Sequence, residues 1–154
     1  MTVQRPSLVD PRGQRFAAAV TTLVLTATLL TGSPWLLAAQ AVVFAVAAGR
    51  GVHASPYGWV FRRFVRPRLA PPAELEDARP PRFAQAVGLG FAVVGLLGAA
   101  LGLTPVFLVA TGLALAAAFL NAAFGYCLGC EVYLLIRRYA PRHDVPTTRE
   151  EIPA

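Results

Sequence analysis

The stretch from Phe83 to Cys130, FAQAVGLGFAVVGLLGAALGLTPVFLVATGLALAAAFLNAAFGYCLGC, contains no charged residue. It is too long for a single membrane crossing, which takes about 20 residues. Thr104-Pro105 interrupts it, because proline is not tolerated in the interior of a helix. The stretch therefore predicts two membrane-spanning helices, one over Phe83–Leu103 and one from near Val106 to Phe124–Tyr126.

A second uncharged stretch lies between Arg15 and Arg50 and has the same plan. Thr-Gly-Ser-Pro at 31–34 separates two apolar runs, Phe16–Thr31 and Trp35–Gly49. Both runs are short for a bilayer, so we expect the flanking arginines to extend their guanidinium groups to the membrane surface. The first run also has features of a signal peptide, but a second apolar run so close behind it disfavours cleavage.

The composition agrees with a membrane protein. Of the 154 residues, 56% are hydrophobic and 14% are charged, against about 25% charged in globular domains. This excludes a disordered chain and argues against an ordinary soluble domain. We predict an all-α polytopic membrane protein, a single domain over residues 1–154. It has four transmembrane helices as two tandem hairpins, and residues 143–154 form a mobile tail.

The orientation follows from the arginines. All 14 basic residues are Arg, and the turns around Ser33 and Thr104 carry none. By the positive-inside rule, the arginine-bearing side and both termini are cytoplasmic. Because the arginines lie between apolar blocks, a nucleic-acid partner is disfavoured and the lipid bilayer is the expected one. The arginines expected to fix topology and to lie at the interface are Arg15, Arg62, Arg63, Arg82, Arg137 and Arg138.

The chain contains an internal similarity. Residues 10–20 read DPRGQRFAAAV and residues 77–87 read DARPPRFAQAV, and an Arg-Arg-aromatic sequence follows in each half at 62–64 and 137–139. The pattern favours a duplication with halves of about 10–68 and 77–142, related by an axis along the membrane normal. The alternative is a shared topology signal without common ancestry. The segment before each Arg pair is expected to be an interfacial helix.

Glycine and proline predict where helices end. From Val106 to Ile136 a continuous helix would be about 46 Å long, more than the roughly 30 Å of a bilayer core. We therefore expect it to bend or break at Gly125 and Gly129. The prolines of the middle loop predict irregular structure there; they are Pro67, Pro71, Pro72, Pro80 and Pro81.

Polar and small residues inside the spans predict helix packing. Gln40, Gln85 and Asn121 should face the bundle and form hydrogen bonds, because lipid offers no partner. Small residues four apart allow close helix approach, although an alanine-rich helix shows such rows by chance. The rows are Ala41-Ala45-Gly49, Ala84-Gly88, Gly98-Gly102 and Gly112-Ala116.

One motif carries chemistry, Cys127-Leu128-Gly129-Cys130, which holds both cysteines of the chain. Cys-x-x-Cys brings two sulfurs within disulfide reach when the second cysteine lies in the first turn of a helix, where thiolates are stabilised. Because the cytoplasm is reducing, we expect reactive thiols rather than a structural disulfide. Cys127 is the expected attacking thiol, Cys130 the resolving thiol, and Glu131 a proton acceptor.

Two other interpretations of the cysteines remain. A cysteine in a membrane helix is often a small apolar filler. Zinc needs four ligands, and only His143 or Glu131 could join the pair, so a complete metal site would need a second chain. Counting back from the Arg pairs, Val52 and Ser55 occupy the equivalent places in the first half. No cofactor motif occurs, and His53 and His143 are expected to be solvated or interfacial.

Three segments resemble a family of small, mostly actinobacterial integral membrane proteins classed as a domain of unknown function. They are DPRGQRF at 10–16, SPYGWVFRR at 55–63 and FLNAAFGYCLGCEVY at 119–133. The resemblance covers roughly residues 8–140 and implies four spans in a bacterial plasma membrane and the C-x-x-C. It also implies work with thioredoxin-like proteins or sulfurtransferases, beside which relatives are often encoded. Quinone-coupled membrane oxidoreductases also pair about four spans with a C-x-x-C. This chain departs from them, because its pair is expected on the cytoplasmic side and it has no second cysteine pair to shuttle electrons, so a quinone-coupled reaction is disfavoured.

The leading hypothesis is thiol–disulfide exchange or sulfur-carrier chemistry with a soluble cytoplasmic partner. One alternative is a small-anion transporter or channel with an arginine-rich vestibule. Another is a non-catalytic membrane scaffold that recruits proteins through the middle loop. The sequence leaves open whether the protein is an enzyme and whether it forms a homo-oligomer.

Overall fold

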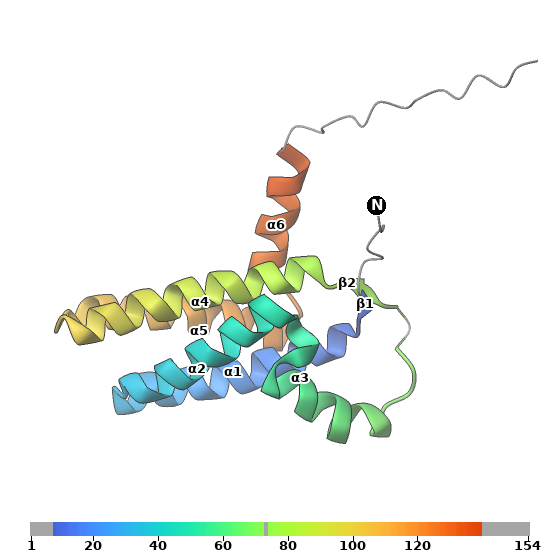
Figure 1. Ribbon diagram of the computed structural model, residues 1–154, viewed down its shortest axis with the longest axis horizontal. Coiled ribbons are helices and arrows are strands. Elements are labelled where there is room, and N and C mark those ends of the chain that lie inside the picture. The colour runs from blue at the N-terminus through green and yellow to red at the C-terminus, as the bar shows by residue number, and fades with distance from the viewer. Residues whose placement is uncertain (1–7, 73, 140–154) are drawn as a thin grey trace, which may run out of the picture.

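A computed structural model describes residues 8–72 and 74–139; the expected mobile tail and His143 lie outside the described residues. Four long helices run side by side as a bundle (Figure 1): α1 (Pro11–Thr31), α2 (Pro34–Arg50), α4 (Arg79–Ala100) and α5 (Thr104–Phe124). Shorter elements gather toward one end of it. These are β1 (Leu8–Val9), η1 (Val52–Ala54), α3 (Pro56–Val60), η2 (Phe61–Val65), η3 (Arg66–Arg68), β2 (Glu76–Asp77) and α6 (Leu128–Tyr139).

The helices begin earlier than their apolar runs. α1 begins at Pro11, because Asp10 caps it by accepting a hydrogen bond from the backbone N–H of Arg12 at 3.0 Å. α4 begins at Arg79, and Pro80 and Pro81 lie in its first turn, where proline lacks only an N–H that would be unpaired anyway. The expectation that these two prolines belong to an irregular loop was therefore wrong. Pro67 lies in the short turn η3.

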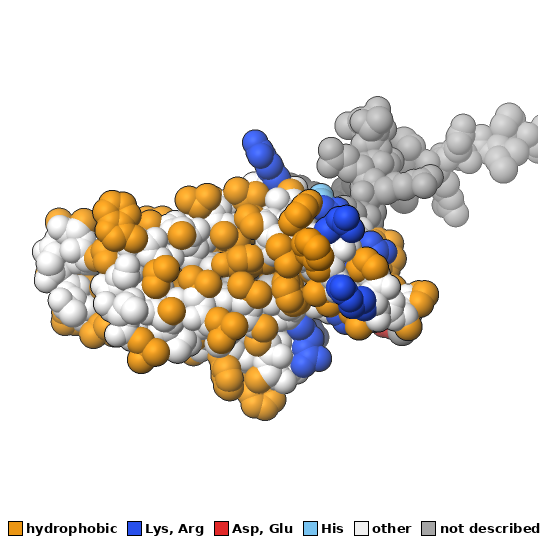
Figure 2. All heavy atoms as spheres, turned by 90° about the horizontal axis from the view of Figure 1, so that it is seen from below, with side chains coloured by type: hydrophobic (Ala, Val, Ile, Leu, Met, Phe, Trp, Pro, Cys, Tyr) orange, Lys and Arg blue, Asp and Glu red, His pale blue; other side chains and the backbone are white. Residues whose placement is uncertain are grey.

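The bundle has two distinct ends. At one end, here called the turn end, Gly32–Ser33 joins α1 to α2 and Leu101–Leu103 joins α4 to α5. At the other end α1 and α4 begin and α2 and α5 finish. The short elements and every arginine of the described residues belong to this arginine end, and arginine side chains are seen toward it in Figure 2. The separation of charge expected from the sequence is thus present in the fold.

Helices from opposite hairpins pack together. α1 packs mainly along α5, and α2 along α4. The core between them includes Leu25, Leu37, Phe44 and Phe107. Gly88 receives the ring of Phe44, and a Cβ on Gly98 would lie 2.9 Å from the backbone of Phe107. Gly88 and Gly98 do allow close approach, whereas no atom lies within 4 Å of a Cβ on Gly49, Gly102 or Gly112.

The outer surface of the bundle is apolar. Large side chains such as Leu30 and Trp35 are more than four-fifths exposed, and hydrophobic groups cover the long face in Figure 2. In water such a surface would be unfavourable, whereas lipid accepts it. α1, α4 and α5 are long and apolar enough to cross a membrane, and α2 is an apolar helix of 17 residues. The structure therefore fits a multi-pass membrane protein.

The chain turns sharply after α5. Gly125 adopts a left-handed conformation with φ of 70°, which glycine tolerates best, and ends the helix as expected. Gly129 does not mark a break, contrary to expectation, because it lies inside α6. α6 leaves the bundle across its long axis (Figure 1). Its exposed apolar side chains, among them Val132, Ile136 and Tyr139, suit a helix lying at a membrane surface.

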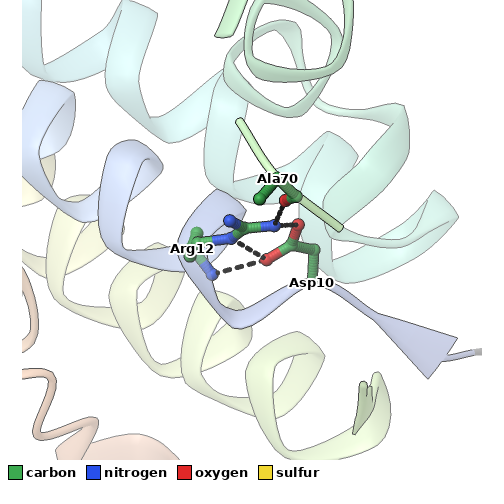
Figure 3. A network of polar contacts seen from close by, with 3 residues as sticks. All are labelled: Asp10, Arg12 and Ala70. Carbon is green, nitrogen blue, oxygen red and sulfur yellow. Dashed lines mark hydrogen bonds and ion pairs between the residues drawn. The ribbon is translucent and has the colours of Figure 1, made fainter. Parts of the chain in front are cut away.

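A polar cluster ties the middle loop to the start of α1. The guanidinium of Arg12 forms an ion pair with Asp10 at 3.0 Å and donates to the backbone carbonyl of Ala70 at 3.0 Å (Figure 3). The Arg12 guanidinium holds the pKa of the Asp10 carboxyl below its usual range. Beside this cluster β1 and β2 pair antiparallel, with Val9 opposite Glu76.

Candidate functional site

Cys127 and Cys130 lie at the N-terminus of α6, where they form a disulfide with a Cα–Cα distance of 5.2 Å. Cys127 immediately precedes the helix. Its Sγ accepts a hydrogen bond from the backbone N–H of Cys130 at 3.3 Å, and its carbonyl accepts one from Glu131 at 3.1 Å. Cys127 is therefore the N-cap of α6, and Cys130 is the third residue of its first turn.

The disulfide differs from the expectation of free thiols. The physical reason is the N-cap turn, which directs the two side chains toward each other and brings the Sγ atoms of Cys127 and Cys130 within bonding distance. Both cysteines are half-buried, so neither is sealed in the core. If the bond were reduced, the Cys127 thiolate would lie at the positive end of the α6 dipole with a backbone N–H directed at it. Helix N-termini stabilise thiolates in this way.

Gly129, between the two cysteines, is the point at which α6 touches the bundle. A Cβ built on it would lie 2.6 Å from both Cα and Cβ of Ala84 in α4. One turn further along α6, Tyr133 packs on Phe83, with ring centroids 5.6 Å apart. These contacts hold the start of α6 against the start of α4, so the position of the disulfide is set by helix packing.

Arg15 reaches the segment that leads into Cys127. Its Nη2 donates to the carbonyls of Ala122 and Ala123 at 3.3 and 3.5 Å, at the end of α5. The same side chain would contact a Cβ on Gly125, two residues before Cys127. The sequence predicted only a topological and interfacial place for Arg15, because its contact with the second half of the chain arises only on folding.

The remaining predicted site residues have different surroundings. Glu131 is exposed in the first turn of α6, where a carboxylate stabilises the helix dipole, and it has no ion pair within the described part of the chain. Arg137 and Arg138 lie in the last turn of α6, two helical turns beyond Cys130. Arg62 and Arg63 lie in η2 and are exposed.

A cavity of about 400 Å³ opens at the arginine end, and Cys127 forms part of its wall. Its lining combines apolar side chains with polar and charged ones. The polar and charged lining residues are Asp10, Gln14, His53, Ser55, Tyr57, Arg62, Arg66, Gln85 and Asn121. Volumes of this size accommodate small molecules. Four of the predicted site residues belong to the wall, although nothing in the sequence indicated that they share one cavity: Arg62, Gln85, Asn121 and Cys127.

The three polar residues that were predicted to lie within the spans have different surroundings. Gln40 is 1% exposed; it accepts a hydrogen bond from the Tyr57 hydroxyl at 2.8 Å and donates to Thr21 at 3.4 Å. The prediction that it faces the bundle and is hydrogen-bonded is confirmed. Burial raises the pKa of Tyr57, which keeps its hydroxyl a donor. Gln85 and Asn121 are half-buried and line the cavity instead.

A metal centre finds no support in the described residues. Residues 8–72 and 74–139 contain no cluster of three or more His, Cys, Asp or Glu side chains that could hold an ion. The histidine within the described ranges, His53, is exposed and lines the cavity.

The fold fits a helical multi-pass membrane protein, and its Cys-x-x-Cys pair lies at the N-terminus of α6. A family model, the domain of unknown function DUF4395, matches residues 9–138, and the chain belongs to this family. No curated protein and no solved structure matches the chain.

Proposed function

We propose that the protein crosses a bacterial plasma membrane four times, with the arginine end and both termini in the cytoplasm. Support for α2 as the fourth span comes from its ends. It runs between the same two ends of the bundle as its neighbours, and Arg82 of α4 donates to its last carbonyls, those of Ala48 and Gly49, at 2.9–3.2 Å. At 1.5 Å per residue α2 is about 25 Å long, a mismatch that local membrane thinning accommodates.

The proposed activity is thiol–disulfide exchange between the Cys127–Cys130 pair and a soluble thioredoxin-like protein. The partner's thiolate attacks Sγ of Cys127, the Sγ–Sγ bond breaks, and Cys130 leaves as a thiolate that takes up a proton. The partner's second thiol then attacks the mixed disulfide, which oxidises the partner and releases both cysteines reduced. Exchange is reversible, so the same steps run backward with an oxidised partner.

The observation that carries this proposal is the position of the pair. Cys127 is the N-cap and accepts a hydrogen bond from the N–H of Cys130, so its sulfur is the one that a helix N-terminus stabilises as thiolate or leaving group.

The reduced Cys127 thiolate would also accept sulfane sulfur from a partner's persulfide, forming a Cys127 persulfide and freeing the partner's thiolate. A sulfurtransferase is the corresponding partner for this sulfur-carrier variant of the proposal.

Trapping tests the exchange. Cys130→Ser leaves the mixed disulfide at Cys127 without its resolving thiol, and Cys127→Ser is the matched control. Each purified variant is mixed with a bacterial thioredoxin that lacks its own resolving cysteine and has been activated as a mixed disulfide with thionitrobenzoate. We expect a covalent complex, cleaved by dithiothreitol, several times faster with Cys130→Ser than with Cys127→Ser. Equal rates, or no complex with either variant, would refute exchange at Cys127.

We further propose that the two halves are a duplication about an axis along the bundle. Arg15 caps the end of α5 and Arg82 caps the end of α2, and in each case the accepting carbonyls lie three and two residues before a positive-φ glycine, Gly125 or Gly51. In the β1–β2 pair, Val9 lies opposite Glu76, and these two residues are equivalent in the aligned halves. A twofold axis between two antiparallel strands places equivalent residues opposite each other, as Val9 and Glu76 are.

Helix caps revise the correspondence of the cysteines within that duplication. Ser55 caps α3 by accepting the N–H of Gly58 at 3.1 Å, as Cys127 caps α6 by accepting the N–H of Cys130. Ser55 is thus the counterpart of Cys127, and Gly58 that of Cys130, rather than the pairing obtained by counting back from the Arg pairs. One half carries a hydroxyl where the other carries the reactive sulfur.

One observation favours a second function, passage of small anions. The cavity at the arginine end is lined by Arg62 and Arg66, which would attract anions to the cytoplasmic mouth. Uptake of radiolabelled sulfate or thiosulfate into proteoliposomes, compared between the wild type and the double Cys→Ser variant, separates the two functions. Flux that survives loss of both cysteines supports transport without thiol chemistry, and absence of flux in the wild type excludes transport of these anions.

A further inference from the structure

We infer that the cavity beside Cys127 binds a small anionic thiol, which reacts with the Cys127–Cys130 disulfide. The inference rests on the proposed exchange function and names a second, low-molecular-weight class of substrate for the same pair. Four properties of the cavity carry it: its place between the two halves of the chain, its size, its charge, and the cysteine of the disulfide, Cys127, in its wall.

The cavity lies where the two halves of the chain meet. Residues that are equivalent in the aligned halves line it from both sides. From the aligned segments the pairs are Leu8 with Leu75, Gln14 with Pro81 and Ala17 with Ala84. Ala47 and Asn121 form a further pair, because each lies four residues before a positive-φ glycine, and the two caps Ser55 and Cys127 form another. A cavity formed between paired elements in this way is a feature of the fold. α1, α2, α4 and α5 contribute to its wall, together with the caps Ser55 and Cys127.

Size selects a small ligand. At about 400 Å³ the cavity is near the lower limit of ligand sites, so it suits a molecule of low molecular weight and excludes a folded partner. Part of the wall is apolar, including Val43, Ala47 and Phe61, and part is polar, including the amides of Gln85 and Asn121. Such a wall suits a short carbon chain that carries a polar head.

Charge selects an anion. Arg62 and Arg66 line the cavity, and the carboxylate in the wall, Asp10, is already paired with Arg12. The lining therefore has a net positive charge even with Asp10 ionised. Positive groups around a low-dielectric cavity concentrate anions from solution.

The disulfide selects a thiol. The ligand's thiolate attacks Sγ of Cys127, forming a mixed disulfide while Cys130 leaves as a thiolate and is protonated. A second thiolate of the same kind then attacks the ligand's sulfur in that mixed disulfide. This releases the Cys127 thiolate and a disulfide of two ligand molecules, so the protein pair gains two electrons and two ligand thiols lose them.

The test compares three thiols that differ in charge: mercaptoethanesulfonate, mercaptoethanol and cysteamine, which are anionic, neutral and cationic. The rate of disulfide reduction in the purified oxidised protein is followed by maleimide gel shift at matched thiolate concentrations. We expect saturation with mercaptoethanesulfonate and a rate about tenfold above that of mercaptoethanol, with cysteamine slowest. The preference should shrink as salt is raised.

Two pairs of variants assign the effect to the cavity. Arg62→Gln combined with Arg66→Gln should remove the preference for the anion, whereas Arg63→Gln, at an exposed neighbour outside the cavity lining, should keep it. Val43→Phe should fill the cavity and abolish saturation, whereas Val42→Phe, on the exposed side of the same helix, should not. Tryptophan-fluorescence melting checks that each variant is folded.

Failure of this inference is distinct from failure of the exchange function. Linear, charge-independent reduction by all three thiols, together with normal exchange with thioredoxin, overturns the cavity site alone. Saturation that persists unchanged in the Arg62/Arg66 and Val43 variants overturns it as well. A disulfide that neither thioredoxin nor any of the three thiols reduces overturns both proposals.

Discussion

Replacing Gly129 with alanine should move the disulfide without altering either cysteine. The added Cβ would lie 2.6 Å from Ala84, whereas carbon atoms in ordinary contact are about 3.5–4.0 Å apart. α6 therefore has to shift by roughly 1 Å relative to α4. Overpacking of this kind costs about 1–3 kcal/mol, and the better helix propensity of alanine offsets about 1 kcal/mol of it.

Gly90→Ala is the matched control, because Gly90 lies on the surface of α4 with open space around the position of a Cβ. It receives the same gain in helix propensity without the clash. The difference between the two variants isolates the packing of α6 on α4 at about 1–3 kcal/mol. For a chain of this length that corresponds to a melting temperature about 5 °C lower for Gly129→Ala than for Gly90→Ala.

The assay is the thermal melting of detergent-purified protein followed by the fluorescence of Trp35 and Trp59. The rate at which thioredoxin reduces the disulfide is measured in parallel, and it should change in Gly129→Ala and not in Gly90→Ala. If Gly129→Ala melts at or above the temperature of Gly90→Ala, then α6 does not pack on α4 at this point. The disulfide would then not be positioned by packing of α6 on α4.

Three further predictions concern the polar contacts that hold the arginine end. Asp10→Asn should lower stability by about 1 kcal/mol at neutral pH. Because the pKa of Asp10 is lower in the folded protein, the stability difference between the wild type and Asp10→Asn should be constant above about pH 5 and disappear as the pH falls below about 4. Thermal melting at a series of pH values measures this difference. Arg82→Gln removes the hydrogen bonds to the carbonyls in the last turn of α2 and should lower the free energy of unfolding by about 1 kcal/mol, measured by thermal melting. The control Arg79→Gln breaks an exposed ion pair and should change the free energy of unfolding by less than about 0.5 kcal/mol. Gln40→Ala leaves the Tyr57 hydroxyl and Thr21 unpaired and should cost about 1–3 kcal/mol, more than Ala39→Ser on the exposed face of the same helix.

Patterns local in sequence predicted the helices well. The uncharged stretches and their Gly-Pro interruptions gave two hairpins, and the arginines gave a bundle with one charged end. The starts of α1 and α4 were missed because hydropathy marks where apolar residues begin, whereas the cap at Asp10 and prolines in the first turn decide where a helix begins.

Contacts between distant residues could not be predicted in the same way. Gly129 looked like a helix breaker, since nothing in its neighbourhood in sequence reveals that Ala84 packs against it. The motif identified Cys127 and Cys130 as a pair, but the cavity beside Cys127 depends on segments from both halves of the chain. Arg15 likewise gains its place near the site only when α1 packs along α5.

The side of the membrane from which a protein reduces the Cys127–Cys130 disulfide decides between cytoplasmic exchange and any other role. Reduced thioredoxin cannot cross a membrane, so it is added with its reductase and NADPH to right-side-out vesicles washed free of cytoplasm or to inverted vesicles, both carrying the oxidised protein. Conversion of the disulfide to two thiols is then read by maleimide gel shift. We expect conversion in inverted vesicles and none in right-side-out vesicles; conversion in right-side-out vesicles, or in neither preparation, would show that the pair does not exchange disulfides with a cytoplasmic protein.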